Sequence, residues 1–241
     1  MIQHLTPATV HGDRRATAAR VLLLGYGVAA GADLLALLAD APTGHTVFKP
    51  LLLPLLAAYA AVSGGPRLLT VALLFGWGGD VMLLLDADLA FLAGMGSFAL
   101  GHLCYLVLFA RHGDRPADRR ARGRRTALGV AYGTALVGTV ALLWPDLPAE
   151  LRVPVAVYSL LLTVTAFRAG ALGLVAGLGG ALFLLSDTLI ATGIADWPQL
   201  PRPDLWVMLT YIAAQFLLAT GVLRAFAARG PRPRPYRGKR T

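Results

Sequence analysis

Two aspartates of this sequence lie inside long apolar stretches, in the segments LFGWGGDVML around Asp80 and FLLSDTL around Asp187. A charged side chain in the middle of a bilayer costs about 2.5 to 3.5 kcal/mol on insertion scales, so ionisable residues in membrane segments are candidates for function. Two carboxyl groups near each other among apolar side chains can retain one proton near neutral pH, as a general acid must. Trp77 precedes Asp80 by three residues, so we expect its ring to border that carboxyl. The pair indicates acid and base chemistry.

Other polar side chains accompany the aspartates in the apolar stretches. His102 and Tyr105, in the segment GHLCY, are three residues apart and share a helix face. Tyr211 and Gln215 form a similar polar cluster in the last apolar stretch, and Lys49 opens the second one. Any one of these residues could simply form a hydrogen bond between helices. Together, at similar depths, they favour a functional site.

Familiar patterns of other chemistries are absent from the sequence. It contains no Gly-x-Ser-x-Gly elbow, no phosphate-binding loop and no dinucleotide-binding fingerprint. We expect His102 to be the single histidine within a helix, with His4, His11, His45 and His112 in tails or loops. A zinc site built from several histidines is therefore not expected, and Cys104, as the sole cysteine, provides no cysteine metal site. Catalysis by carboxyl groups is the chemistry that remains.

The composition requires an apolar solvent around the chain. Of its 241 residues 56% are hydrophobic and 15% are charged, and the mean hydropathy is +0.64, whereas soluble domains carry about 25% charged residues. A spanning helix needs roughly 17 to 25 mostly apolar residues. The sequence predicts an all-α fold of eight transmembrane helices, at residues 20–39, 48–63, 68–85, 89–110, 126–144, 151–168, 171–195 and 205–228.

The distribution of basic residues predicts the topology. Lys and Arg are enriched in cytoplasmic loops, and a cytoplasmic N-terminus places all but three of the 22 lysines and arginines on the cytoplasmic side; the exceptions are Lys49, Arg152 and Arg202. The net charge of +9 is thus explained by topology rather than by nucleic acid binding. We expect a multi-pass protein of the cell (plasma) membrane with both termini cytoplasmic.

Three regions follow from this topology. Residues 1–19 are expected to form a cytoplasmic tail, residues 20–228 the eight-helix membrane domain, and residues 229–241 a basic disordered tail that can touch anionic lipids. The first helix is expected to be retained rather than cleaved as a signal peptide, because its apolar region exceeds the usual length of about 7 to 15 residues and contains Asp33. Asp33 is close enough to the outer surface to reach water.

The helices also predict an internal repeat and a common depth for the polar groups. Asp80 and Asp187 each fall late in an apolar helix, the third and the seventh, so two four-helix halves of the same orientation are expected. At about 1.5 Å of rise per residue, Asp80 lies roughly 9 Å and Asp187 roughly 13 Å below the outer boundary. On the same scale Gln215 lies roughly 15 Å and His102 roughly 20 Å deep. These groups could converge on one cavity in the outer half of the membrane.

Glycines four residues apart predict close helix packing, since small residues let helix backbones approach each other in lipid. Three pairs have this spacing: Gly27 with Gly31, Gly129 with Gly133, and Gly173 with Gly177.

The chain resembles the YhhN family, membrane proteins whose vertebrate members are lysoplasmalogenases. The resemblance covers roughly residues 47 to 223 and depends on the order and spacing of its motifs. The matching pieces are Lys49-Pro50-Leu51, Gly79-Asp80, Phe98 with His102 and Tyr105, Phe183 through Ser186-Asp187, and Tyr211 with Gln215. One departure is Gly78, near which family members are expected to carry a small hydroxyl or another polar residue.

The resemblance implies an eight-helix fold and hydrolysis of the vinyl ether bond of lysoplasmalogens, with release of a fatty aldehyde and a glycerophospho-ethanolamine or -choline. No metal or organic cofactor is implied. Asp80 and Asp187 would share the roles of acid and cation-stabilising carboxylate, with His102 as a further catalytic residue. The implied substrate-binding residues are Lys49 as a phosphate ligand, Trp77, Tyr105, Ser186, Tyr211 and Gln215.

Two alternatives stay open at this point. Another ether or enol lipid could be the natural substrate, because bacterial family members need not meet plasmalogens. Paired membrane carboxylates, tandem repeats and glycine-rich helices are also features of a proton-coupled transporter of small molecules or lipids.

Overall fold

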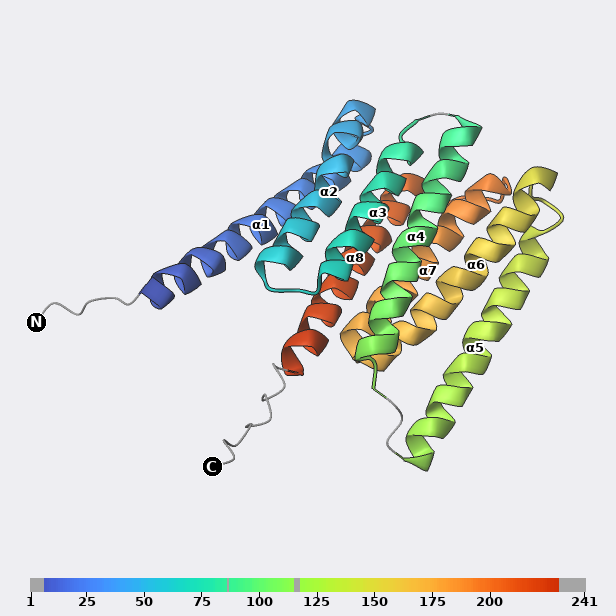
Figure 1. The fold of residues 1–241 in the computed structure, drawn as a ribbon. Helices are drawn as coiled ribbons and strands as arrows, with labels where there is room; N and C mark the ends of the chain where they lie inside the picture. The colour runs from blue at the N-terminus through green and yellow to red at the C-terminus, as the bar shows by residue number, and fades with distance from the viewer. Residues whose placement is uncertain (1–6, 86, 115–117, 230–241) are drawn as a thin grey trace, which may run out of the picture.

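The computed structural model describes residues 7–85, 87–114 and 118–229, which form α-helices and no strand. The eight helices are α1 (Pro7–Leu38), α2 (Pro42–Val62), α3 (Arg67–Leu83), α4 (Asp88–His112), α5 (Arg119–Leu143), α6 (Ala149–Ala169), α7 (Leu174–Ile194) and α8 (Pro203–Ala228). A short 3-10 turn, η1 (Gly170–Leu172), joins α6 to α7. The helices lie side by side as a bundle (Figure 1).

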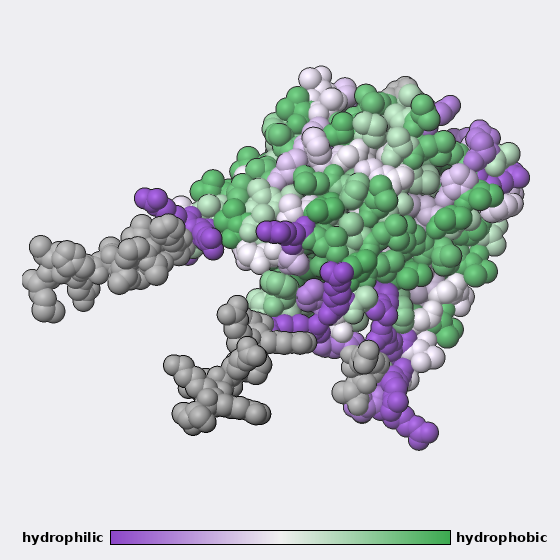
Figure 2. Space-filling model, in the orientation of Figure 1, coloured by the Kyte–Doolittle hydropathy of each residue, from purple (hydrophilic) through white to green (hydrophobic). Residues whose placement is uncertain are grey.

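The bundle is built to face lipid. Seven of the helices, all except α3, are long and apolar enough to cross a membrane. Large apolar side chains cover the outside, among them Leu24 at 69% exposure and Val28 at 71%. Figure 2 shows a broad hydrophobic flank with hydrophilic side chains gathered mainly at its ends. The chain is therefore a multi-pass integral membrane protein.

The helices differ in how deeply they are buried. α8 is the most enclosed: it packs against α7 and also contacts α1, α2, α3 and α4. α5 lies at the edge of the bundle and packs on α6, and Leu143 is its one buried residue. The interior surrounded by α3, α4, α6, α7 and α8 is where the polar groups gather.

Close helix contacts depend on glycines other than those predicted. At Gly79 of α3 a Cβ atom would lie 2.5 Å from the Phe98 ring of α4, and at Gly180 of α7 it would lie 2.8 Å from the Ala166 backbone of α6. At Gly101 it would lie 3.0 Å from the Ala72 carbonyl. These positions hold α3 against α4 and α7 against α6, because any side chain would force the helices apart.

The predicted glycine pairs were wrong as contacts between spanning helices. Gly27, Gly31 and Gly133 have nothing within 4 Å of a Cβ position, because they lie on outward faces. Gly129 makes ordinary contact with the Phe167 ring, and Gly177 faces the neighbouring η1 turn. Gly173 has a φ of 111° and precedes α7, so it is a turn residue.

The predicted helix bounds are confirmed to within three residues except at three starts, because α2 begins at Pro42 rather than residue 48, α5 at Arg119 rather than residue 126, and α1 differs most. α1 begins at Pro7 rather than near residue 20, so most of the stretch predicted as an N-terminal tail is helical. His11, His45 and His112, predicted in tails or loops, lie in α1, α2 and α4. The predicted C-terminal tail lies outside the described residues except for Arg229, which forms an ion pair with Asp114 at 2.8 Å.

Candidate active site

A cavity of about 80 Å³ opens among seven of the helices, α2 to α8. It contains both aspartates of the sequence analysis and one basic side chain among the described residues that line it, Lys49. Its polar lining residues are Lys49, Asp80, Thr139, Tyr158, Ser159, Ser186, Asp187, Thr188 and Tyr211. Apolar side chains form the rest of the wall, so charges in this cavity are poorly solvated.

Asp80 projects from α3 into the bundle and is 2% exposed. The Tyr211 hydroxyl of α8 donates a hydrogen bond to its Oδ2 atom at 2.8 Å. The Phe98 ring packs on the neighbouring Gly79 and meets the Tyr211 ring edge to face, with centroids 6.1 Å apart. The carboxyl thus has a fixed orientation between a phenol and an aromatic wall.

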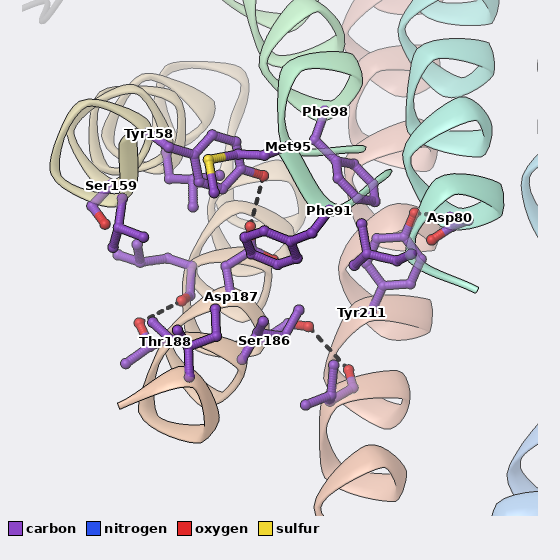
Figure 3. Close-up of a pocket in the computed structure, with 18 of the residues that line it drawn as sticks. Asp80, Phe91, Met95, Phe98, Tyr158, Ser159, Ser186, Asp187, Thr188 and Tyr211 are labelled. Carbon is purple, nitrogen blue, oxygen red and sulfur yellow. Dashed lines mark hydrogen bonds between the residues drawn. The ribbon is translucent and has the colours of Figure 1, made fainter. Parts of the chain in front are cut away.

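Asp187 has a matching arrangement in the other half of the chain. The Tyr158 hydroxyl of α6 donates a hydrogen bond to its Oδ2 atom at 2.8 Å (Figure 3). The sequence analysis did not identify Tyr158 as a site residue. A depth comparison could have found it, because Tyr158 is nine residues from the start of α6 and Asp187 seven from the end of α7.

His102 and Tyr105 lie behind the cavity rather than in its lining. The His102 ring is 3% exposed and stands edge to face against Phe183, with centroids 4.5 Å apart. Its Nδ1 atom has no hydrogen-bond partner among the described residues. Tyr105 donates a hydrogen bond to Oε1 of Gln215 at 3.2 Å, one helical turn from Tyr211. These three residues form a layer behind the aromatic wall of the site.

Lys49 lines the cavity from α2 and is 9% exposed. Its helix packs directly against α3, which carries Asp80. One turn earlier on α2, the His45 Nδ1 atom lies 2.9 Å from Oδ1 of Asp33. The expectation that Asp33 reaches water was wrong: its side chain is completely buried, because α2 covers it.

Of two further predicted site residues, Ser186 lines the cavity and Trp77 does not. Ser186 lines the cavity and is 1% exposed, and its hydroxyl donates to the Val207 carbonyl at 3.0 Å, which joins α7 to α8. Trp77 is 40% exposed and does not line the cavity, so the structure does not bring it together with the other predicted site residues.

The departure at Gly78 has a structural counterpart on the neighbouring helix. A Cβ atom at Gly78 would lie 2.7 Å from Oγ of Ser97, whose hydroxyl donates to the Phe75 carbonyl at 2.6 Å. A hydroxyl therefore occupies this space, but α4 supplies it.

The site combines two carboxyl groups, each of which accepts a hydrogen bond from a tyrosine hydroxyl, with one cation in a largely apolar cavity. Such groups can donate a proton to a bound molecule and stabilise a positive charge that develops on it. The described residues contain no cluster of three or more His, Cys, Asp or Glu side chains able to hold a metal ion.

Comparison with known proteins shows the family to which this chain belongs. The model of the YhhN family matches residues 44–222, which include both aspartates, both phenols and Lys49. The chain belongs to the YhhN family. Relatives in this family match about 70% of the length of this chain.

Three of these relatives are named lysoplasmalogenases. Human lysoplasmalogenase TMEM86B is 37% identical over 164 residues, which are 68% of this chain and 67% of the human protein. A lysoplasmalogenase of Mycobacterium tuberculosis is 32% identical over 193 residues, 74% of this chain and 72% of that protein. Rat lysoplasmalogenase TMEM86B is 33% identical over 179 residues, 73% of this chain and 71% of the rat protein. No solved structure matches the chain.

Proposed function

We propose that this protein hydrolyses the vinyl ether bond of lysoplasmalogens and releases a fatty aldehyde and a glycerophospho-ethanolamine or -choline. The observation that carries the proposal is the pair of phenol-bonded aspartates in one apolar cavity, in a chain whose relatives are named lysoplasmalogenases. These names favour a hydrolase over the transporter alternative. Other ether or enol lipids share the reacting bond and are further possible substrates.

The chemistry of a vinyl ether fits this set of groups. Hydrolysis begins with slow transfer of a proton to carbon, which produces an oxocarbenium ion that water captures. A positioned acid accelerates the first step, and a carboxylate facing the cation stabilises the charge as it develops. Asp80 and Asp187 supply these two groups, and Tyr211 and Tyr158 hold them in place through hydrogen bonds.

The other polar residues bind or position the substrate. Lys49 binds the phosphate of the lysolipid, because it is a basic side chain in the wall of the cavity. Ser186 contributes to the polar wall. Tyr105 and Gln215 support Tyr211 from behind, and His102 supports the aromatic wall at Phe183, so these three act on the site without lining it.

The topology belongs to the same proposal. All eight helices, α3 included, cross the cell membrane, and both termini are cytoplasmic. The arginines at the helix ends support this orientation, among them Arg67 and Arg119, the first residues of α3 and α5. The cavity then lies toward the outer leaflet, since Lys49 follows the α1 to α2 turn.

An assay of the purified protein tests the function. The full chain in detergent, given lysoplasmalogen, should release fatty aldehyde. Detergent removes any transmembrane gradient, so a transporter would release none. If the protein is inactive in detergent and shows proton-dependent flux of a solute in sealed vesicles, it is a transporter and the hydrolase proposal fails.

A further inference from the structure

The cavity has two chemically different sides. Lys49, Asp80 and Tyr211 come from α2, α3 and α8, whereas the opposite side is formed by α5, α6 and α7. In Figure 3 Asp80 and Tyr211 lie on one side of the cavity, and Tyr158 and Ser159 lie across from them. The α5–α7 wall combines apolar side chains such as Leu143 and Ile190 with the neutral hydroxyls of Thr139, Tyr158, Ser159, Ser186 and Thr188, and it carries no basic side chain among the described lining residues.

The two aspartates differ in their electrostatic surroundings. Asp80 shares its side of the cavity with Lys49, the one basic side chain among the described residues of the lining, and a nearby cation favours the charged form of a carboxyl. Asp187 has the neutral Tyr158 phenol as its hydrogen-bond partner, and the described cavity residues of α5, α6 and α7 include no basic side chain. A carboxyl with no cation on its side of the cavity is the better reservoir of a proton.

We propose that a lysolipid lies across the cavity with its phosphate at Lys49 and its alkenyl chain on the α5–α7 wall, so that Asp187 protonates the vinyl ether and Asp80 faces the resulting cation. This assignment rests on the proposed function and adds to it the binding direction of the substrate and the separate role of each aspartate. The charged end of the substrate meets the cation, and the chain meets the wall that carries no basic side chain, on which Leu143, Val155, Ile190 and Ile194 supply apolar contacts.

The connectivity of the substrate supports the same assignment. In a vinyl ether the ether oxygen is followed by two alkenyl carbons, and the proton adds to the second, on the chain side. The positive charge then rests on the first carbon and the oxygen, on the glycerol side. With the phosphate at Lys49, the carbon that receives the proton lies toward Asp187, and the cation lies toward Asp80.

The proton transfers balance over one turnover. Since Oδ2 of Asp187 accepts the Tyr158 hydrogen bond, the acidic proton is on Oδ1. The alkene electron pair takes this proton to form a C–H bond, and Asp187 becomes ionised. Water adds to the cation and gives a proton to Asp80, which forms a hemiacetal. Asp80 then returns the proton to the departing ether oxygen, while Asp187 accepts the hemiacetal hydroxyl proton as the aldehyde forms.

A pair of non-hydrolysable lysolipids tests the assignment on the full chain in detergent. One carries a saturated ether in place of the vinyl ether, and the other carries a protonated secondary amine in place of the ether oxygen, where the cation develops. Wild-type protein should bind the amine more tightly than the ether, and Asp80→Asn should reduce this preference by about 30-fold or more. Asp187→Asn should retain the preference. Binding of the ether lipid by each variant reports that its fold and cavity are intact.

Three outcomes overturn the assignment: a wild-type protein without preference for the amine, a preference that depends on Asp187, or one that survives Asp80→Asn. Failure of the function itself has a separate signature, because a wild-type protein that releases no aldehyde contradicts the hydrolase proposal. Aldehyde release together with an amine preference that follows Asp187 contradicts only the division of roles.

Discussion

The hydroxyl of Tyr211 donates to Oδ2 of Asp80 at 2.8 Å, and this bond connects α8 to α3 across the interior of the bundle. It fixes the direction in which the carboxyl faces the cavity. The Tyr158 hydroxyl does the same for Asp187 between α6 and α7. The arrangement makes the phenols positioning residues whose loss should affect turnover.

Replacement of Tyr211 by Phe should lower kcat for aldehyde release by about 10- to 100-fold, because a hydrogen bond to a charged group contributes about 1.5 to 3 kcal/mol. The ring packing with Phe98 would remain, so the fold should be retained. Tyr132→Phe is the matched control, since that tyrosine lies on α5 outside the cavity and meets the Phe167 ring edge to face. Equal activity of the two variants would contradict the positioning role.

Replacement of Lys49 by Gln should raise KM for a lysoplasmalogen by about 10-fold or more, because the substrate phosphate loses a charged partner. The same variant should leave KM nearly unchanged for an alkenylglycerol that lacks the phosphate. Steady-state kinetics with both substrates separate the two effects. A similar rise in KM for both would show that Lys49 does not bind the phosphate.

Replacement of Ile190 by Phe should narrow the α5–α7 wall and reduce kcat/KM more for a long-chain lysolipid than for a short-chain one. Leu185→Phe provides the control on the same helix, because Leu185 is 46% exposed on the outer face and does not line the cavity. A chain-length series assayed with both variants measures the effect. If Ile190→Phe slowed all chain lengths equally, the chain would lie elsewhere.

Replacement of Gly79 by Ala should destabilise the protein by about 1 to 3 kcal/mol through overpacking, because its Cβ would lie 2.5 Å from the Phe98 ring. Gly96→Ala on the adjacent helix has open space and should be neutral or stabilising by up to about 1 kcal/mol. Thermal unfolding of the two variants in one detergent gives the comparison. Equal stability would contradict the close α3–α4 contact.

Sequence patterns predicted the helices because apolar length is a strong physical requirement for crossing a bilayer. The start of α1 was missed because Arg14 and Arg15 end the apolar pattern, although the helix continues through them. The internal four-plus-four repeat and the orientation of the termini stay predictions.

The aspartates could be predicted as buried site residues because their positions in apolar segments carry a cost that needs a reason. Tyr158 was not recognised, since a tyrosine in a membrane helix is also a normal packing residue; its depth alone could have suggested it, but its hydrogen bond depends on how α6 meets α7. Trp77 lies outside the cavity lining because sequence spacing gives its neighbourhood but not how far its ring reaches from the interior.

The most direct test of the central claim is aldehyde release from lysoplasmalogen by purified wild-type protein, Asp80→Asn and Asp187→Asn, with the exposed Asp204→Asn as control. The wild type and the control should be active. Each cavity variant should lose activity by about 100-fold or more, the scale of general acid–base catalysis. Full activity of either cavity variant would contradict the proposed mechanism.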